Sequence, residues 1–199
     1  MYEKIDALRT ISGCTVLVDE PMSAHTSFRI GGPADRFVCV ENQEALKKVL
    51  ETIAEEQLPL FVLGKGSNLL VADEGFRGVV LSLEGDFKQI TLDNDGVTIR
   101  CGAGASLSSL CKFARDHALS GLEFAWGIPG SAGGAAYMNA GAYGGEMKDV
   151  LTSVQAVSLD GREKTLYADE LDLSYRHSVF TGGTDIITFV CLRLVPSKV

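Results

Sequence analysis

Two glycine-rich stretches and one arginine-containing block hold the residues whose types and spacing could do chemistry. The first stretch is "GKGSN", Gly64 to Asn68. Two glycines separated by one residue let successive backbone N–H groups point into one concavity, which suits a phosphate or pyrophosphate. Ser67 and Asn68 add side-chain donors. An ordinary turn that uses glycine for its positive φ is the alternative interpretation.

Neither of two common nucleotide-binding motifs fits this stretch. A P-loop requires a glycine five residues before the Gly-Lys pair, where the chain has Pro59. A Rossmann fingerprint requires a third glycine where the chain has Leu69. The sequence after Asn68 is apolar and indicates a strand rather than a long helix. Any phosphate bound here must therefore be held in another way.

The second stretch, residues 127–145, reads "GIPGSAGGAAYMNAGAYGG" and contains seven glycines and five alanines. Such residues bury little apolar surface, so we expect their backbone to lie against a planar ring system or a pyrophosphate. Ser131 is expected to cap a short helix that begins near Ala132 and directs its positive dipole end at an anion. A flexible linker is the alternative, although linkers favour Ser, Thr, Pro and charge over interspersed Tyr, Met and Asn.

The third candidate is the block "LDLSYRHSVF", residues 171–180. Strand alternation would place Tyr175 and His177 on one face and Arg176 and Ser178 on the other. A permanently cationic arginine could clamp a carboxylate or stabilise a developing enolate. A surface ion pair is the alternative for Arg176. For His177, a general base and a structural histidine both remain open.

The elements that must position these residues follow from hydrophobic periodicity, which predicts an α+β chain with an early βαβ element and later hairpins. Caps at Asn42 and Ser106 begin the two predicted helices. The predicted strands are 35–42, 58–64, 78–83, 96–102, a hairpin over 153–166 around Asp160-Gly161, and 185–195; the apolar run 58–64 is expected to be buried. The predicted helices are 43–58, with an apolar face of Ala45, Leu46, Val49, Leu50, Ile53 and Ala54, and 106–119. Residues up to about 20 show no clear pattern, and a division of the chain is expected near residues 83–88.

Composition narrows the class of protein. The net charge of −8 and the pI near 4.9 argue against nucleic acid or an anionic membrane as the main partner. No apolar run approaches the ~20 residues that span a bilayer, and "MYEKIDALRT" lacks a secretory h-region, so a cytoplasmic location is expected. The five cysteines show no CxxC spacing. We therefore expect reduced thiols, without a zinc site or a disulfide framework.

Four blocks together resemble one family: "HTSFRIGGPADRF", "LGKGSNLLV", "GLEFAWGIPGSAGGAAYMNAGAYGGEM" and "LSYRHSVF". Their order and spacing are similar to those of the UDP-N-acetylenolpyruvoylglucosamine reductases, also called UDP-N-acetylmuramate dehydrogenases, over about residues 21–195. The resemblance implies an α+β fold, namely a two-subdomain FAD-binding module of the vanillyl-alcohol-oxidase (PCMH) type. Residues 1–85 would form the first subdomain with the N-terminal segment, and residues 86–199 the second.

The resemblance also implies a cofactor site for non-covalent FAD. The first stretch would cradle the pyrophosphate, and the second would line the flavin and its phosphates. The residues it assigns to the cofactor are Gly64, Lys65, Gly66, Ser67, Asn68, Leu69, Pro129, Gly130, Ser131, Gly133, Gly134, Asn139, Ala140, Gly141, Ala142 and Tyr143.

In this family NADPH reduces the flavin, and the reduced flavin passes hydride to the enolpyruvyl double bond of a UDP-sugar that serves peptidoglycan synthesis. Arg176 corresponds to the catalytic arginine, and Tyr175 with Arg176 would bind the substrate. His25 stands where the family has asparagine, a departure that concerns a minor contact. The family's proton-donating serine and its second catalytic acid have no counterpart up to Val199.

We therefore expect the C-terminal substrate-binding domain to be absent and the full reaction to be incomplete in these 199 residues. A monomer is expected, with weak association through an uncovered apolar face. Two alternatives remain. One is an FAD oxidoreductase of the same superfamily acting on another sugar or alcohol, against which the Tyr175-Arg176 block and the lack of an obvious covalent flavin attachment both argue. The other is a non-catalytic nucleotide-binding domain.

Overall fold

The computed structural model describes residues 2–197, and within them the chain folds as two compact units. The first unit ends at Asp86 and includes Leu159–Arg162, and the second runs from Phe87 to Ser158 and resumes at Glu163. The division of the chain thus falls inside the predicted range 83–88. The assignment of residues 1–85 and 86–199 to two FAD-binding subdomains stays a prediction.

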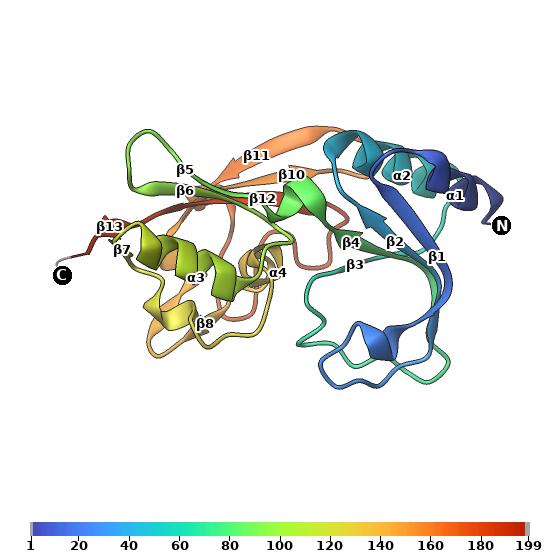
Figure 1. The fold of residues 1–199 in the computed structure, drawn as a ribbon, viewed down its shortest axis with the longest axis horizontal. Coiled ribbons are helices and arrows are strands. Elements are labelled where there is room, and N and C mark those ends of the chain that lie inside the picture. Colours follow the sequence, from blue (N-terminus) through green and yellow to red (C-terminus); the bar gives the residue numbers. More distant parts are fainter. Residues whose placement is uncertain (1, 198–199) are drawn as a thin grey trace. The chain divides into compact units, whose positions relative to one another are not determined.

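The first unit is built on a four-stranded sheet in the order β1-β2-β4-β3. Strand β1 is antiparallel to β2, whereas β2 and β3 both run parallel to β4. Figure 1 shows α1 beside α2 along one side of this sheet. The elements are α1 (Glu3–Ala7), η1 (Leu8–Thr10), β1 (Cys14–Pro21), η2 (Met22–Ala24), β2 (Pro33–Val40), α2 (Gln43–Glu55), β3 (Leu60–Leu63) and β4 (Phe76–Leu83).

Helix α2 forms where hydrophobic periodicity predicts a helix, and that prediction is confirmed. Its cap is Asn42, whose Oδ1 accepts the backbone N–H of Ala45 at 2.9 Å. The buried face consists of Ala45, Leu46, Val49, Leu50, Thr52 and Ile53. Ala54, predicted on the same face, is exposed instead. Together β2, α2 and β3 form the predicted βαβ element, with β4 inserted between the two strands.

Three details of this unit differ from the prediction. Strand β3 was expected to be buried, but Phe61 and Val62 are 37% and 40% exposed because β3 is the edge of the sheet. No strand follows Asn68, since the chain stays irregular until β4 begins at Phe76. Strand β1 escaped prediction because only two of its eight residues, Cys14 and Val16, are buried.

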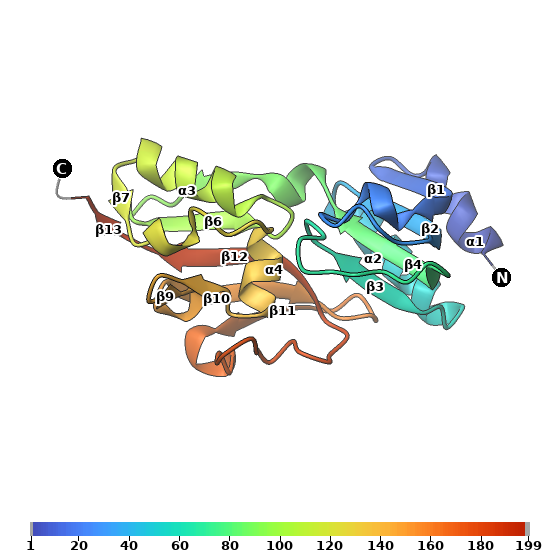
Figure 2. The ribbon, with the colours of Figure 1, turned by 90° about the horizontal axis from the view of Figure 1, so that it is seen from below.

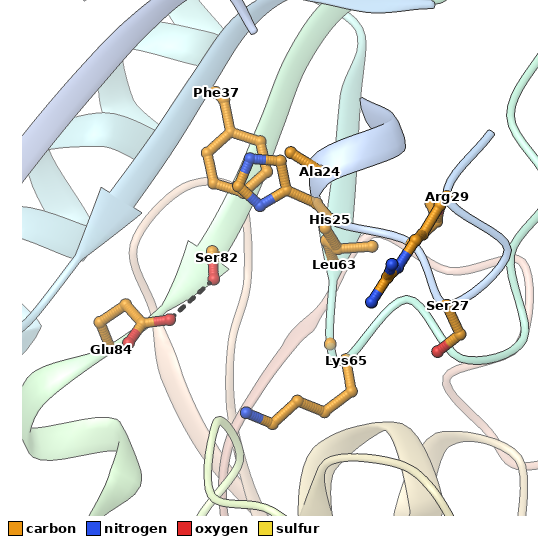
Figure 3. Close-up of a pocket in the computed structure, with 11 residues that line it drawn as sticks. Ala24, His25, Ser27, Arg29, Phe37, Leu63, Lys65, Ser82 and Glu84 are labelled. Carbon is orange, nitrogen blue, oxygen red and sulfur yellow. Dashed lines mark hydrogen bonds between the residues drawn. The ribbon is translucent and has the colours of Figure 1, made fainter. Parts of the chain in front are cut away.

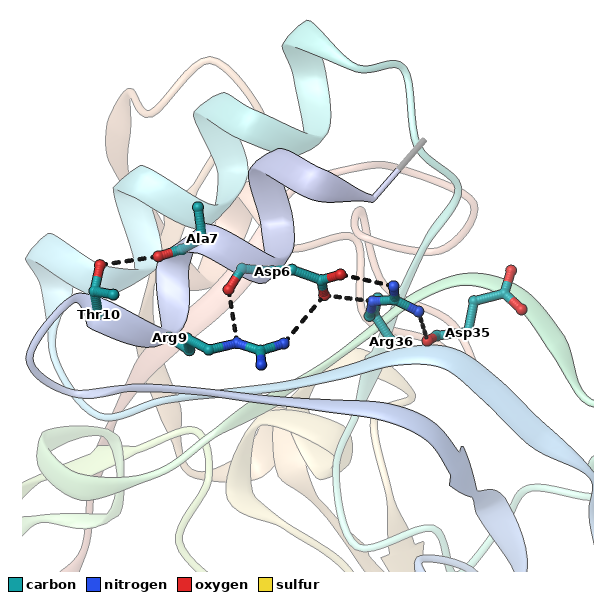
Figure 4. Close-up of polar contacts among 6 residues, drawn as sticks. All are labelled: Asp6, Ala7, Arg9, Thr10, Asp35 and Arg36. Carbon is teal, nitrogen blue, oxygen red and sulfur yellow. Dashed lines mark hydrogen bonds and ion pairs between the residues drawn. The ribbon is translucent and has the colours of Figure 1, made fainter.

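Charged groups fasten α1 to β2 (Figure 4). The Arg36 guanidinium donates from Nε to Asp6 Oδ1 at 2.6 Å and from Nη2 to Asp6 Oδ2 at 2.8 Å. These bonds lower the pKa of the Asp6 carboxyl. Beside them the Tyr2 hydroxyl donates to Asp35 at 2.6 Å, and burial together with this bond raises the pKa of Tyr2 to about 12.

The second unit is built on an antiparallel five-stranded sheet in the order β11-β10-β12-β6-β5. Helix α4 contacts β12 and β6, and α3 packs beside α4 (Figure 2). The larger elements are β5 (Ile90–Leu92), β6 (Thr98–Gly102), α3 (Leu107–Asp116), α4 (Ala132–Tyr137), β10 (Leu151–Val157), β11 (Glu163–Tyr167) and β12 (Ile186–Arg193). Two small ladders pair β7 (Leu119–Ser120) with β13 (Val195–Pro196) and β8 (Gly141–Ala142) with β9 (Gly145–Glu146). Short 3-10 helices are η3 (Gly85–Lys88) at the unit boundary, η4 (Glu123–Ala125), η5 (Met147–Asp149) and η6 (Ala168–Glu170).

The predicted helix and hairpin of this unit are confirmed. Ser106 caps α3 by accepting the Ser109 N–H at 3.0 Å, and β10 pairs with β11 around the Asp160-Gly161 turn. The helix ends at Asp116, earlier than predicted, because Ala118 takes a left-handed φ of 52°. No disulfide joins the five cysteines, all of which lie within residues 2–197. Among those residues, none of the helices combines the length and apolar character needed to cross a bilayer.

Candidate functional site

The first glycine stretch is the loop that follows β3 in the first unit. Gly66 has a φ of +60°, and a Cβ there would lie 2.0 Å from the carbonyl oxygen of His25. The Gly66 carbonyl in turn accepts the Ser27 N–H at 3.0 Å. Gly66 is therefore required by the fold itself, because only glycine allows this close backbone approach.

A pocket of about 530 Å³ opens beside this loop (Figure 3). It is lined by Ala24, His25, Thr26, Ser27, Arg29, Phe37, Leu63, Gly64, Lys65, Ser82 and Glu84, all of the first unit. Lys65 and Arg29 bring positive charge to it, and Ser82 donates to Glu84 Oε1 at 3.2 Å. Of these residues, sequence reasoning selected only Gly64 and Lys65 as site residues.

The imidazole of His25 forms one wall of the pocket. It stacks on the ring of Phe37 with centroids 4.0 Å apart, and its Nε2 lies 2.8 Å from Glu20 Oε1. The signal that could have found this wall was the "HTSF" block, in which His25 replaces the asparagine of the resembling family.

The N-terminus of α4 follows the prediction in part. Ser131 is the cap, and its Oγ accepts the Gly134 N–H at 3.2 Å. The N–H groups of Ala132 and Gly133 donate to the carbonyls of Ala105 and Ala103 at 2.8 and 2.9 Å. Protein acceptors thus take the first three N–H groups of this six-residue helix. The Ser131 cap and the helix start are confirmed, and the expectation that this N-terminus directs its positive dipole end at an anion stays a prediction.

Close packing accounts for some glycines of the second stretch. A Cβ on Gly133 would lie 2.6 Å from the Cβ of Ala103, and one on Gly141 would lie 2.7 Å from the carbonyl oxygen of Gly145. A Cβ on Gly145 would lie 3.0 Å from Phe124. At these three positions the absence of a side chain serves close packing within the second unit.

Three other glycines of the stretch, Gly127, Gly130 and Gly134, are not required by close packing. A Cβ on Gly127 would meet nothing within 4 Å, and one on Gly130 would meet only Leu107 at 3.8 Å. Gly134 is exposed, and its nearest neighbour would be the Ser131 hydroxyl at 3.1 Å. None of the three has a left-handed φ. Each leaves open backbone that an added side chain would cover, which is the property expected of a ring-binding segment, and we call these three residues the glycine surface.

Asn139 ends the helical part of the second stretch and is 4% exposed. Its amide nitrogen donates to Glu146 Oε2 at 2.5 Å and to the Ser174 carbonyl at 3.2 Å. Its Oδ1 accepts the Lys148 N–H at 2.9 Å. Both amide hydrogens are therefore in use within the protein. Glu146 also pairs with the Lys148 ammonium, which raises the pKa of Lys148.

The remaining cofactor candidates of this unit surround the β8–β9 hairpin. Ala140 donates its N–H to the Ala135 carbonyl at 2.8 Å, and Ala142 pairs with Gly145. Tyr143, at the hairpin tip, is 94% exposed, and Pro129 is exposed before α4. In the first unit Asn68 is exposed, whereas Ser67 and Leu69 are half-buried.

The block at residues 171–180 is a turn and not a strand. Ser174 and His177 exchange two backbone hydrogen bonds of 3.2 and 3.1 Å, which leaves Tyr175 and Arg176 at the two central positions. Arg176 has a left-handed φ of 53°, so the predicted alternation of faces is wrong. Tyr175 is 89% exposed. His177 lies 3.2 Å from the exposed carboxylate of Asp172, which favours its structural interpretation.

The second unit brings the glycine-rich stretch and the Tyr175-Arg176 turn together. Asn139 bonds to Ser174, and the buried Ser178 hydroxyl donates to the Tyr137 carbonyl at 2.6 Å. The loop at residues 64–69 belongs to the first unit. Among residues 2–197, no group of three or more His, Cys, Asp or Glu side chains is placed to hold a metal ion.

Known proteins are similar to this chain over most of its length. A family described as FAD binding domain matches residues 34–167. The UDP-N-acetylenolpyruvoylglucosamine reductase of Syntrophomonas wolfei is 45% identical over 90% of this chain and 59% of its own length. The corresponding protein of Geobacillus thermodenitrificans is 46% identical over 98% of this chain and 63% of its own length. The chain thus spans about three-fifths of the length of these curated relatives.

Solved structures agree with this similarity. The UDP-N-acetylenolpyruvylglucosamine reductase of Thermus caldophilus superimposes with a TM-score of 0.76 at 38% identity, covering 92% of this chain and 63% of that one. The BBE-like 1 protein of Physcomitrella patens has a TM-score of 0.66 at 17% identity, covering 97% of this chain and 44% of that one. The second likeness concerns the fold alone.

Proposed function

Because this chain belongs to the FAD-binding domain family and has the α+β fold of the vanillyl-alcohol-oxidase (PCMH) type, we propose that it is the FAD-binding part of a UDP-N-acetylenolpyruvoylglucosamine reductase. Identity of 45–46% to proteins of that name over nine-tenths of the chain supports this assignment. We further propose that the protein takes part in the NADPH-dependent reaction of peptidoglycan precursor synthesis. This is a proposal because the chain spans 59–63% of the length of those relatives.

One observation carries the cofactor assignment, namely the open glycine surface of the second unit. Neither packing nor backbone conformation requires Gly127 and Gly130, and at Gly134 an added Cβ would meet only the Ser131 hydroxyl, at 3.1 Å. A bulky residue would cost the fold little there, whereas it would block a planar ligand. We assign the flavin to this surface, and its pyrophosphate to the Gly64–Leu69 loop.

When bound, FAD supplies the hydride transfer from NADPH to the enolpyruvyl group of the UDP-sugar. The chain's own part in that reaction is electrostatic. Arg176 is exposed and has neither an ion pair nor a side-chain hydrogen bond with any residue of the described range 2–197. Its guanidinium is therefore available to bind the substrate carboxylate in a bidentate manner. A fixed cation at that place stabilises the negative charge that develops next to the carboxylate as the double bond is reduced.

The experiment compares Arg176→Ala with wild type in the FAD-loaded protein. We expect FAD affinity and NADPH-dependent bleaching to stay within about twofold, and the affinity for UDP-N-acetylglucosamine enolpyruvate, read from the change it causes in the bound flavin spectrum, to fall about tenfold or more, as for loss of a hydrogen-bonded charge. Arg115→Ala is the matched control, because Arg115 is an exposed arginine of the same unit that pairs only with its neighbour Asp116. Unchanged affinity of Arg176→Ala for the UDP-sugar would refute the role. Turnover of another sugar or alcohol in place of the UDP-sugar would favour the alternative oxidoreductase.

A further inference from the structure

The position of Arg176 cannot be set by its own side chain, which has no partner among residues 2–197. The backbone must set it instead. Two hydrogen bonds between Ser174 and His177 close the turn that carries Arg176, but they lie within the turn and do not orient it. The turn belongs to the connection between β11 and β12 (Figure 2).

An external contact to the turn comes from Asn139. The Ser174 carbonyl, which already accepts the His177 N–H, also accepts the Asn139 amide at 3.2 Å. The two residues are 35 positions apart in the chain. Asn139 lies two residues after the end of α4, the helix that contains Gly134, so this bond ties the arginine turn to the segment assigned to the flavin.

Asn139 is itself held firmly enough to act as an anchor. It is almost fully buried, and its remaining amide hydrogen and its Oδ1 are bonded to Glu146 and to the Lys148 N–H. Its φ of 45° lies in the left-handed region, which asparagine tolerates better than most side chains. Aspartate at this position could not donate to Ser174 and would place a second carboxylate against Glu146. Asparagine therefore supplies an amide donor, a carbonyl acceptor and tolerance of a left-handed φ at this position, and few residues combine these properties.

We propose that Asn139 is a positioning residue, whose amide holds the Tyr175-Arg176 turn at a fixed place beside the glycine surface and so sets where Arg176 meets the substrate carboxylate. The second half of this statement rests on the proposed function. The first half does not, because it concerns only contacts within the second unit. Asn139 acts through Arg176 and not by contact with the substrate.

The test begins with the structural half, measured by amide hydrogen exchange in the FAD-loaded protein. Asn139→Gly keeps the left-handed backbone accessible and deletes the amide, and Asn139→Asp keeps the Oδ1 acceptor while it removes the donor. Both remove the bond from the Asn139 amide to the Ser174 carbonyl, and loss of that one bond to the turn is expected to speed exchange across residues 172–178 about fivefold. Exchange in β6 and β12 should stay unchanged. Asn94→Gly, at an exposed turn of the same unit, is the matched control.

The functional half is a double-mutant cycle with Arg176→Ala, read as the response of the bound flavin spectrum to the UDP-sugar at saturating FAD. In the wild-type background Asn139→Gly should weaken this response about tenfold or more. In the Arg176→Ala background it should have no further effect. Equal effects in both backgrounds, or unchanged exchange at residues 172–178, would overturn the proposal. Absence of any response to the UDP-sugar in wild type would instead count against the proposed function, and the exchange result would still decide whether Asn139 holds the turn.

Discussion

The hydroxyl of Ser178 donates a 2.6 Å hydrogen bond to the carbonyl oxygen of Tyr137, 41 residues earlier in the chain. Ser178 is completely buried, and its Oγ also accepts the Phe180 N–H at 3.3 Å. With the bond between Asn139 and Ser174, this contact fastens both ends of the Tyr175-Arg176 turn to the end of α4. The exposed Arg176 thus lies on a turn whose two ends are attached through Asn139 and Ser178, both of which are buried.

Replacing Ser178 with alanine should destabilise the protein. The Tyr137 carbonyl would lose the donor that the fully buried Ser178 supplies, so the free energy of unfolding should fall by ~1–3 kcal/mol. Urea unfolding followed by circular dichroism measures this change. Ser108→Ala, at an exposed serine of α3, should change it by less than about 0.5 kcal/mol. Equal stability of the two variants would show that the Ser178 bond does not hold the turn.

The two adjacent glycines of α4 should respond oppositely to substitution. Gly133→Ala places a Cβ 2.6 Å from Ala103, so we expect a loss of ~1–3 kcal/mol in unfolding free energy. Gly134→Leu projects outward past the Ser131 hydroxyl, so the fold should keep its melting temperature while FAD affinity falls at least about tenfold. Thermal unfolding of the apo protein and FAD titration separate the two effects. Unchanged FAD affinity in Gly134→Leu would remove the flavin from this surface.

The bond between Asp6 and Arg36 should make stability depend on pH in the acid range. The folded state lowers the pKa of Asp6, so its contribution is fully present above the unfolded pKa of ~3.9 and is lost as pH falls through the lower folded value. Asp6→Asn should therefore cost ~1.5–3 kcal/mol at pH 7, as for a hydrogen-bonded charge pair. The difference from wild type should shrink as the pH falls below about 4.

Urea unfolding at pH 7, 5, 3 and 2 tests this dependence. Asp116→Asn is the control, because the Asp116–Arg115 pair is exposed and should matter little at any pH. A difference between Asp6→Asn and wild type that stays constant down to pH 2 would mean that the carboxylate charge of Asp6 does not fasten α1 to β2.

Local patterns were enough to predict most regular elements. The caps Asn42 and Ser106 and the apolar faces behind them determine α2 and α3, because helix signals lie within a few residues of each other. The hairpin at Asp160-Gly161 is encoded in the same local way. No local pattern predicts strand β1 or the exposure of β3, because an edge position depends on the order of strands in the sheet.

The candidate site was predictable in composition but not in arrangement. The sequence indicated which glycines are unusual, yet only the structure separates Gly133, which packs against Ala103, from the exposed Gly134. It likewise suggested a strand around Arg176, since the two-residue turn there depends on a left-handed φ that arginine rarely adopts. The bond from Asn139 to Ser174 joins residues 35 positions apart, and such a contact follows only from the folded chain.

The central claim is that this chain binds FAD and passes electrons from NADPH to it, and the visible absorption spectrum tests it most directly. The purified protein is measured alone, after addition of FAD and removal of the excess, and after NADPH under anaerobic conditions. We predict a protein-bound flavin band that bleaches with NADPH in wild type and is lost in Gly134→Leu. Absence of bound flavin at excess FAD would contradict the account, and a bound flavin that NADPH leaves oxidised would contradict its assignment as an NADPH-dependent reductase.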